Sequence, residues 1–359
     1  MEARRFRVAR KVRESEVISS FYLEAADGRP LEPFKGGQFL TFEIDLPGQD
    51  EAVVREYSLS SPPHDTARYR VAVKREDAPP GRSDLPSGLV SNYLHDHVEE
   101  GVELSAHDPR GQFVLDADST QPVVLLSGGV GLTPTVSMLH ELAAAGDRDA
   151  WFIHACDNGR VHAMGDEVRA LAAGNPRIRT HFCYRFPESG DAGRFDSEGV
   201  VTKELLQSLL PLDDYEFYLC GPSPFMKAIY GALRDLGVHN DRVHFEFFGP
   251  ATLITEPEEP AKVAPVTESS DAAAAGPQVT FRKSGKTVVW DGSAETLLEF
   301  AESHGLQPEF SCRAGVCNTC MIGLAAGEVH YIEEPLDPPE PGTALICCSR
   351  PITDVELDI

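Results

Sequence analysis

The spacing of hydrophobic and polar residues predicts strands over the first part of the chain. About the first hundred residues contain short runs of β-branched and aromatic residues, bounded by Gly, Pro and Asp. Such runs are typical of strands that are joined by turns. The runs at residues 39–44, 69–73 and 102–105 show this composition most clearly. We therefore expect an N-terminal domain that consists mainly of sheet.

A different pattern begins at Pro122. Residues 123–126 form an apolar run that predicts a buried strand, and a glycine-rich loop follows it. Residues 135–145 have helical spacing of their apolar positions, and residues 151–154 again indicate a strand. Strands that alternate with helices are typical of a parallel sheet with crossover helices. The middle of the chain is therefore expected to be an α/β domain.

The composition changes once more between residues 256 and 276. This stretch consists mostly of Pro, Glu, Ala, Ser and Thr, with almost no large apolar residue. It offers too little apolar surface for a packed core, so we expect a linker. We predict domains at residues 1–115, 116–250 and 277–359, with the linker at 251–276.

The net charge limits the kinds of molecule that the chain is expected to bind. The 359 residues include 32 Lys and Arg against 57 Asp and Glu, which gives a formal net charge of -25. Phosphate backbones and anionic lipids repel such a chain, so the charge excludes nucleic acid and membrane surfaces and favours a partner with a basic docking surface. The longest apolar runs are far shorter than the roughly 20 residues of a membrane helix. The N-terminus also lacks the apolar segment of a signal peptide, so we expect a cytoplasmic protein.

The cysteines are concentrated near the C-terminus, where five of the eight lie in the last fifty residues. In a cytosolic chain such a cluster indicates metal binding rather than disulfides. Cys312, Cys317 and Cys320 have the x4 and x2 spacing of plant-type [2Fe–2S] sites, with a further cysteine 27 positions later. A structural zinc is the alternative, although zinc sites usually come as two CxxC pairs.

The fourth cysteine ligand is ambiguous because Cys347 and Cys348 are adjacent. Residues 344–350 resemble a segment of reductase-type ferredoxin domains, in which an apolar run is followed by Cys, one residue, Ser and Arg. This resemblance implies that Cys347 is the ligand. Cys348 would then be a buried small hydrophobic residue.

Residues 55–60, Arg-Glu-Tyr-Ser-Leu-Ser, hold an Arg, an aromatic residue and a hydroxyl at alternating positions of a strand. These side chains could contact the phosphate, ring face and ring edge of one ligand, although a surface strand could carry the same residues. The segment resembles the RxYS motif of the ferredoxin–NAD(P)+ reductase superfamily. Residues 33–39 resemble the turn upstream of that motif, and residues 88–94 resemble its phosphate-binding GxxS helix start.

The resemblance implies a flavin site. Arg55 would bind the flavin phosphates, Tyr57 would lie against the isoalloxazine ring, Ser58 would bond near its N5 atom and Ser91 would bind the pyrophosphate. Residues 88–96 and 244–250 resemble flavohaemoglobin reductase modules, which use FAD, more than the FMN-dependent phthalate dioxygenase reductases. The candidate FAD-binding residues are Arg55, Tyr57, Ser58, Leu59, Ser60, Gly88, Val90, Ser91 and Phe248. The candidate catalytic residues are Ser58, Cys220 and Glu246.

A second set of motifs indicates a nicotinamide site. The loop Gly-Gly-Val-Gly-Leu-Thr-Pro at residues 128–134 follows a strand and opens a helix, where a pyrophosphate can approach the backbone. It resembles the GGxGxTP motif of the same superfamily, and residues 220–222 resemble its CGP motif. Asp157 ends a strand where NADPH-dependent enzymes commonly place Ser or Arg, so we favour NADH. Asp157 could instead be an uninvolved exposed carboxylate, with Arg160 serving a phosphate. The candidate NAD-binding residues are Gly128, Gly129, Gly131, Thr133, Asp157, Cys220, Gly221 and Pro222.

The resemblance covers nearly the whole chain outside the linker. It implies an antiparallel flavin-binding β-barrel, an α/β nucleotide-binding domain with a parallel sheet, and a β-grasp ferredoxin domain. The implied reaction is a relay from NADH through FAD and a [2Fe–2S] cluster to an external redox-acceptor protein. No globin precedes the flavin domain, so we do not expect this chain alone to dioxygenate nitric oxide.

The domain order resembles the reductase components of multicomponent mono- and dioxygenases, so the expected acceptor is a soluble terminal oxygenase. A reductase for another redox protein, such as hybrid-cluster protein or a cytochrome P450, is the alternative within the same class. A redox-sensing module is the alternative from another class. A sensor would have no need of both cofactor pockets, which disfavours that alternative.

Overall fold

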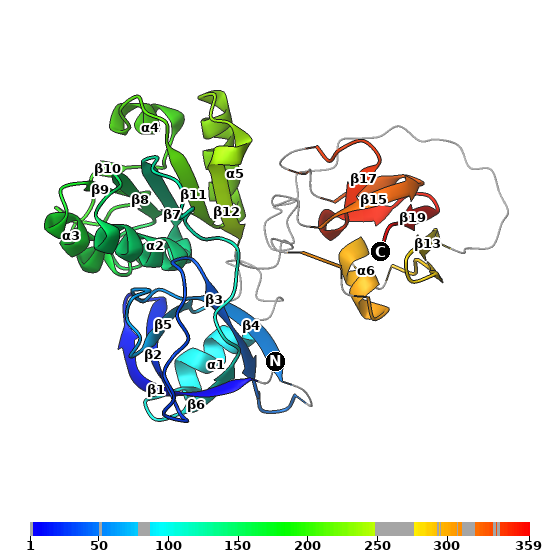
Figure 1. The fold of residues 1–359 in the computed structure, drawn as a ribbon, viewed down its shortest axis with the longest axis horizontal. Coiled ribbons are helices and arrows are strands. Elements are labelled where there is room, and N and C mark those ends of the chain that lie inside the picture. Colours follow the sequence, from blue (N-terminus) through cyan, green and yellow to red (C-terminus); the bar gives the residue numbers. More distant parts are fainter. Residues whose placement is uncertain are drawn as a thin grey trace. The chain divides into compact units, whose positions relative to one another are not determined.

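The computed structural model describes residues 3–49, 52–77, 87–247 and 276–359, except residues 293, 295, 307, 311–319, 333, 334, 336 and 337. The chain forms two compact units, residues 1–245 and 246–359 (Figure 1). Of the positions selected from the sequence, Phe248, Cys312 and Cys317 lie outside the described residues.

The first part of the N-terminal unit is an antiparallel sheet of six strands in the order β4-β3-β6-β1-β2-β5. Its strands are β1 (Arg4–Arg13), β2 (Ile18–Ala25), β3 (Phe39–Ile44), β4 (Val53–Ser58), β5 (Tyr69–Lys74) and β6 (Glu103–Ala106). Leu59, directly after β4, forms an antiparallel bridge with Val71 of β5, and this bridge closes the sheet into a barrel. The three strands predicted from the sequence are confirmed as β3, β5 and β6.

The barrel encloses an apolar core. Phe6, Leu23, Phe42 and Tyr69 are each at most 1% exposed. Helix α1 (Leu89–His97) adds Val90 to this core. Burial of each large apolar side chain stabilises the fold by about 1.5–3 kcal/mol. The packed core of the barrel therefore holds the residues on β4 and at the start of α1 in a fixed position.

The second part of this unit is a sheet in the order β10-β9-β8-β7-β11-β12. Its strands are β7 (Val123–Gly128), β8 (Ala150–Cys156), β9 (Ile178–Tyr184), β10 (Ser197–Glu198), β11 (Glu216–Gly221) and β12 (Val243–Phe247). Strands β10, β9, β8, β7 and β11 pair in parallel. The connecting helices are α2 (Leu132–Ala145), α3 (Gly165–Gly174), α4 (Lys203–Leu209) and α5 (Ser223–Asp235). The predicted α/β domain with a parallel sheet is confirmed.

Every residue of β7 and β11 is buried, as expected for central strands of a parallel sheet that is covered on both faces. From β7 the chain proceeds to β8, β9 and β10 on one side, and it then returns to β11 on the other side of β7. Ligands of open α/β sheets bind at such a reversal, outside the carboxyl ends of the strands. The loops after β7 and β11 are therefore the expected place for a nucleotide.

The C-terminal unit has a five-stranded sheet in the order β14-β13-β19-β15-β17 and a smaller pair, β16 with β18. Strands β13 and β19 are parallel, and the other pairings are antiparallel. The strands are β13 (Gln278–Phe281), β14 (Lys286–Val289), β15 (Met321–Ala326), β16 (Val329–Tyr331), β17 (Thr343–Leu345), β18 (Ser349–Pro351) and β19 (Val355–Leu357). Helix α6 (Leu297–Ser303) packs its apolar residues into the core of this unit, which fits the predicted β-grasp domain.

No helix in the described part of the chain is both long and apolar enough to cross a membrane.

Candidate cofactor-binding site

The six described α-helices begin in two different ways. Helices α3, α4 and α6 have acidic residues in the first turn, and threonine side chains cap α4 and α6. Helices α1, α2 and α5 have neither an acidic first turn nor a side-chain cap. The first N–H groups of a helix are unsatisfied and carry a partial positive charge, so an uncapped start is suited to an anion. These three helix starts are the ones that coincide with the GxxS, GGxGxTP and CGP motifs.

The glycine loop and the CGP motif lie against each other at the carboxyl ends of β7 and β11. Ser127 is in register with Cys220 across these two strands. A Cβ atom added at Gly131 would lie 2.2 Å from the backbone oxygen of Cys220. The loop reaches the motif this closely only because residue 131 has no side chain. The structure thus brings together two motifs that are about 90 residues apart in sequence.

Other predicted residues of the nicotinamide site have defined roles in this loop. Gly129 has φ of +54°, a left-handed conformation that favours glycine. The hydroxyl of Thr133 donates to the carbonyl oxygen of Val130 at 3.1 Å, which fixes the loop to the first turn of α2. Cys220 is fully buried, and Gly221 lies so close to Phe225 that an added Cβ would be 2.7 Å from its ring. The backbone, rather than the side chains, is therefore what the loop offers to a ligand.

Asp157 follows β8 and forms an ion pair with Arg185, whose Nη2 lies 2.8 Å from Oδ1 of the carboxylate. Arg160 is also engaged, with Nε 3.5 Å from Oε2 of Glu16 and 3.4 Å from Oε1 of Glu188. Arg185, the ion-pair partner of Asp157, and Arg160, three residues after Asp157 in sequence, are thus both paired with carboxylates. The end of β8 therefore presents a carboxylate that suits a ribose hydroxyl. Arg160 and Arg185 both already have acidic partners, so neither is available to a phosphate.

The flavin motif occupies β4 and the residues after it. Arg55 is exposed and Tyr57 is half-buried, and both stand on the same face of the strand because side chains alternate. The ring of Tyr57 packs edge-on against Phe42, with centroids 5.8 Å apart. Burial raises the pKa of Tyr57 to about 12, with a smaller opposing effect from Arg55, so the phenol keeps its proton at neutral pH. Ser58 is buried at the end of the strand.

Three members of the predicted FAD set are buried. Leu59 and Ser60 are fully buried, and Arg70 engages both the hydroxyl and the carbonyl of Ser60. Val90 lies in the barrel core. These three residues present backbone rather than side chains to any ligand, and their contacts with FAD stay a prediction.

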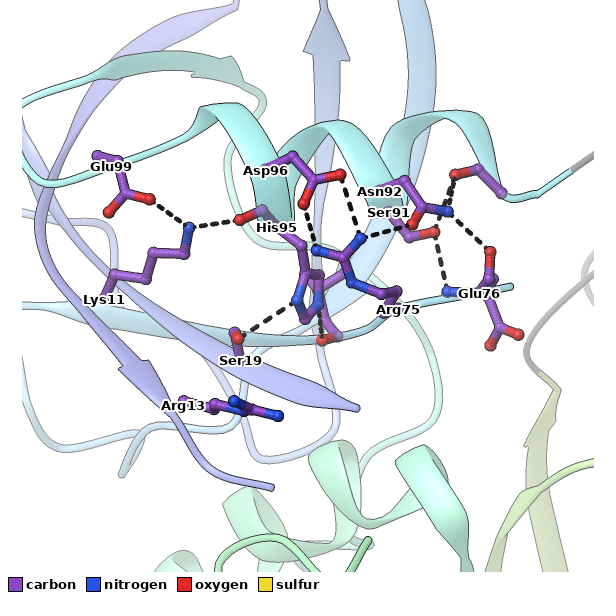
Figure 2. Close-up of polar contacts among 12 residues, drawn as sticks. Lys11, Arg13, Ser19, Arg75, Glu76, Ser91, Asn92, His95, Asp96 and Glu99 are labelled. Carbon is purple, nitrogen blue, oxygen red and sulfur yellow. Dashed lines mark hydrogen bonds and ion pairs between the residues drawn. The ribbon is translucent and has the colours of Figure 1, made fainter. Parts of the chain in front are cut away.

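Hydrogen bonds join the start of α1 to Glu76, which follows β5 (Figure 2). The N–H of Gly88 donates to the carbonyl of Glu76 at 2.8 Å, and Asn92 Nδ2 donates to the same oxygen at 2.8 Å. Ser91 Oγ donates to the carbonyl of Gly88 at 3.2 Å and accepts from the N–H of Glu76 at 3.3 Å. Arg75 in turn binds Asn92 and Asp96. Gly88 and Ser91 are thereby held in a fixed geometry at the first turn of the helix.

A cavity of about 610 Å³ lies farther along α1, and none of the predicted site residues lines it. Lys11 Nζ is 2.9 Å from Glu99 Oε1 inside it, and Arg75 is paired with Asp96. Its lining residues are Lys11, Arg13, Glu16, Ser19, Arg75, His95, Glu99 and Glu100. Two of its three lysine or arginine side chains are thus already matched by acids, and His95 is the one lining residue that belongs to the segment 88–96.

Glu246 is half-buried on β12. Two residues before it, His244 places Nε2 2.7 Å from Oε2 of Glu216 and stacks on Tyr218 with ring centroids 4.6 Å apart. These contacts fix the start of β12 on β11.

In the C-terminal unit, two of the predicted cluster ligands converge. Cys320 and Cys347 are buried, with their Sγ atoms 2.9 Å apart and no disulfide between them. Cys348 Sγ lies instead 3.6 Å from the carbonyl of Leu345. The short 3₁₀ helix at residues 346–348 therefore sends the two adjacent cysteines in different directions. Two converging thiols in an apolar core fit the ligand set of an iron–sulfur cluster.

Sequence reasoning missed a partly buried cluster that joins the barrel to the α/β domain. Arg70 of β5 pairs with Glu167 of α3, and His140 of α2 contacts the same carboxylate. The sequence did contain one signal. Arg70 stands among apolar residues of a strand, and a buried arginine is rarely found without a partner.

Comparisons with known proteins agree with this geometry. Residues 6–115 match the oxidoreductase FAD-binding domain, residues 125–230 the oxidoreductase NAD-binding domain, and residues 279–351 the 2Fe-2S iron-sulfur cluster binding domain. The chain is 46% identical over 254 residues to a flavohemoprotein of Bacillus thuringiensis subsp. konkukian, an alignment that covers 70% of this chain. It spans 62% of the length of that relative.

Two solved structures are similar over different extents. The FAD/NAD-binding domain of nitric oxide dioxygenase from Vibrio cholerae O1 biovar El Tor is 34% identical, with a TM-score of 0.62, over 70% of this chain and 100% of that one. Phthalate dioxygenase reductase is 25% identical, with a TM-score of 0.60, over 99% of this chain and 98% of that one. The chain therefore belongs to the FAD- and NAD-binding oxidoreductases of the flavohaemoprotein reductase type, followed by a 2Fe-2S domain in the domain order of phthalate dioxygenase reductase.

Proposed function

We propose that this chain is an NADH-dependent reductase that passes electrons through FAD and a [2Fe–2S] cluster to an external acceptor protein. The observation that carries the proposal is the contact between the glycine loop and the CGP motif at the start of α2, in the same unit as the barrel with the RxYS strand. Bound FAD would supply the conversion of a hydride into single electrons, and a [2Fe–2S] cluster would supply one-electron transfer. The protein residues hold these groups and tune their surroundings.

The proposed binding roles come from the family resemblance, and the charge and position of the residues support them. Arg55 supplies a cation for the flavin phosphates, and the uncapped start of α1 with Ser91 supplies N–H groups for the pyrophosphate. Tyr57 offers a neutral ring face, because its pKa of about 12 keeps the phenol protonated. Ser58 is the hydrogen-bonding group for the flavin ring edge. Phe248 is a further member of the proposed flavin set, and Ser58, Cys220 and Glu246 are the proposed catalytic residues.

The nicotinamide dinucleotide is proposed to bind at the carboxyl ends of β7 and β11. Gly128, Gly129, Gly131 and Thr133 form its pyrophosphate loop, and residues 220–222 border the nicotinamide. Asp157 favours NADH, because its carboxylate repels a 2′-phosphate and holds Arg185 in an ion pair.

The cluster is proposed to bind Cys312, Cys317, Cys320 and Cys347. The convergence of Cys320 and Cys347 supports this set, and the different direction of Cys348 supports Cys347 over its neighbour.

The acceptor is proposed to be a soluble terminal oxygenase with a basic docking surface. Residues 277–359 contain 13 acidic against 5 basic residues, so a basic surface would be attracted to them. Reduction of cytochrome c, a basic one-electron acceptor, should slow several-fold as salt rises from low to physiological concentration, because the Debye length shortens to about 8 Å. A rate that is independent of salt would contradict the acidic docking surface.

An anaerobic titration with NADH tests the whole relay. The purified protein should show flavin absorbance with a broad cluster shoulder, and both should bleach at about 1.5 NADH per chain, since FAD takes two electrons and the cluster one. Flavin absorbance without the shoulder would contradict the cluster. An absence of bleaching with NADH, while dithionite still bleaches the protein, would contradict the nicotinamide site.

A further inference from the structure

A partly buried ionic cluster lies where the barrel meets the α/β domain. Arg70 of β5 is 5% exposed and forms two hydrogen bonds with Glu167 of α3, at 2.7 Å and 2.9 Å. His140 of α2 places Nε2 2.6 Å from the same carboxylate. Burial works against ionisation of Glu167, but the hydrogen bonds from His140 and Arg70 hold its pKa at about 2. At neutral pH the cluster therefore contains a charged, bidentate pair.

The same arginine also holds the flavin motif. Arg70 Nε donates to Ser60 Oγ at 3.0 Å, and Nη2 donates to the carbonyl of Ser60. The N–H of Ser60 donates back to the carbonyl of Arg70 at 2.7 Å. Ser60 is the last residue of the RxYS segment, two positions after Ser58. One guanidinium thus binds the end of the flavin motif on one side and a helix of the nicotinamide domain on the other.

Helix α2 connects this cluster to the glycine loop. The helix begins after Gly131 and carries His140 near its other end. Between these points, Ser137 Oγ donates to the carbonyl of Ser61 at 3.0 Å, directly after the flavin motif. Glu141 accepts from the N–H of Gly36, in the turn upstream of the motif, at 2.7 Å. The helix whose start opens the nicotinamide loop is therefore fastened along its length to the flavin-binding strand and turn.

Stability alone does not explain why charged side chains join the barrel to the α/β domain. A buried ion pair is often no more stable than a well-packed apolar contact, because the charges lose their hydration. What the pair does supply is a defined geometry, since the guanidinium fork fixes both distance and angle to a carboxylate. A defined geometry between two cofactor-binding halves matters for group transfer, where a misplacement of about 1 Å can slow a reaction about 100-fold.

We propose that Arg70, Glu167 and His140 are positioning residues that hold the nicotinamide-binding half in register with the flavin-binding half for hydride transfer. The inference rests on the proposed NADH-to-FAD function. None of the three residues is proposed to touch either cofactor. They act through Ser60 and through helices α2 and α3.

The test uses full-length, FAD-loaded protein with Glu167→Gln and, separately, Arg70→Lys. Arg70→Lys keeps the charge but removes the fork, so it serves as the milder variant if Glu167→Gln fails to fold. Stopped-flow mixing with saturating NADH should show flavin reduction slowed by about 10- to 100-fold. The NADH concentration for half-maximal rate should change by less than about threefold, because the dinucleotide contacts remain. The long-wavelength absorbance of stacked nicotinamide and flavin should weaken in parallel.

Asp235→Asn is the matched control. Asp235 belongs to the same domain and pairs with Lys203 at 3.3 Å on the surface, so it loses the same charge without touching the barrel. This variant should keep the wild-type reduction rate and the wild-type long-wavelength band. Reduction by dithionite, which needs no bound nicotinamide, should be equal in all variants.

The possible outcomes distinguish a failure of the proposed NADH-to-FAD function from a failure of the positioning role. If NADH does not reduce the wild-type flavin, the proposed function fails. If NADH reduces the wild-type flavin, and Glu167→Gln and Arg70→Lys match its rate per bound FAD and its long-wavelength band, the positioning role is refuted. The positioning role is also refuted if the variants reduce less flavin only because they bind less FAD, and the FAD that remains is reduced at the wild-type rate.

Discussion

Replacing Gly131 with alanine isolates the contact between the glycine loop and the CGP motif. An alanine Cβ would lie 2.2 Å from Cys220 O, 2.4 Å from Cys220 C and 2.6 Å from Gly221 N. All three are backbone atoms of a buried central strand and its end, which cannot rotate away. Ordinary contacts begin near 3.4 Å, so loop and strand must separate by about 1 Å.

The backbone conformation itself would accept alanine. Gly131 has φ of -60° and ψ of -6°, which are helical values, and alanine is favoured over glycine in helices by about 0.5–1 kcal/mol. The steric contact therefore dominates, and overpacking of this kind costs about 1–3 kcal/mol. A displacement of about 1 Å at the nicotinamide loop should also slow flavin reduction by NADH by about 100-fold.

The assay is anaerobic stopped-flow bleaching of the flavin, together with a thermal melt and reduction by dithionite. Gly231→Ala is the control, because an added Cβ at this position in helix α5 meets nothing within 4 Å. That variant should keep the NADH rate and gain stability. If Gly131→Ala is reduced by NADH within about threefold of the wild-type rate, the loop does not need its close approach to Cys220, and the reasoning is refuted.

Three further predictions follow from single contacts. Cys347→Ser should abolish the cluster absorbance, whereas Cys348→Ser should retain it, because Cys347 Sγ lies 2.9 Å from Cys320 Sγ and Cys348 Sγ is directed to the carbonyl of Leu345. The reverse result would exchange the two assignments. Asp157→Ser should raise the ratio of kcat/KM for NADPH to kcat/KM for NADH by about tenfold or more. The substitution removes a carboxylate that repels the 2′-phosphate, and it releases Arg185 to bind that phosphate. An unchanged ratio would mean that neither residue faces the 2′ position. The folded-state pKa of Glu167 is about 2, below its ordinary value of 4.5, so its stabilising effect is present above pH 4.5 and is lost as the pH falls toward 2. Denaturant melts over this range should show a shallower loss for Glu167→Gln than for wild-type protein, and parallel curves would contradict the ionic cluster.

The fold and most of the motif residues could be predicted because their signals are local. The run of aromatic, β-branched and other residues at 39–44 became β3 with those bounds, since composition and flanking turns decide a strand over a few residues. The loop at 128–131 could be identified because a strand, glycines and a helix follow one another directly. Cys347 could be preferred over Cys348 only through family resemblance. The direction of each thiol depends on the 3₁₀ turn at 346–348, which composition does not reveal.

The ionic cluster could not be predicted, because its members are distant in sequence. Arg70 and Glu167 are 97 residues apart and belong to different domains. Their pairing depends on how β5 and α3 are brought together, and neither residue has a partner within its own element. The arginine inside an apolar strand indicates that a buried acid is needed, but not which one.

The uncapped helix starts lead to a prediction in which stability and cofactor binding move in opposite directions. Leu89 is the first residue of α1 and is 52% exposed. In Leu89→Glu, a carboxylate would enter a first turn that has no acid, which should stabilise the FAD-free protein by about 0.3–1 kcal/mol through the helix dipole. The same charge would repel the flavin pyrophosphate proposed to bind there.

Repulsion between unit charges a few ångströms apart costs about 1 kcal/mol in a water-like medium, which corresponds to about fivefold weaker FAD binding. Salt should reduce this effect. Leu212→Glu is the control, because Leu212 is fully exposed after α4 and begins no helix. FAD titrations and melts of the FAD-free protein measure both quantities. If Leu89→Glu binds FAD as tightly as Leu212→Glu while its melting temperature rises, the helix start is electrostatically active but does not hold the pyrophosphate, and the site must then be sought elsewhere on the barrel.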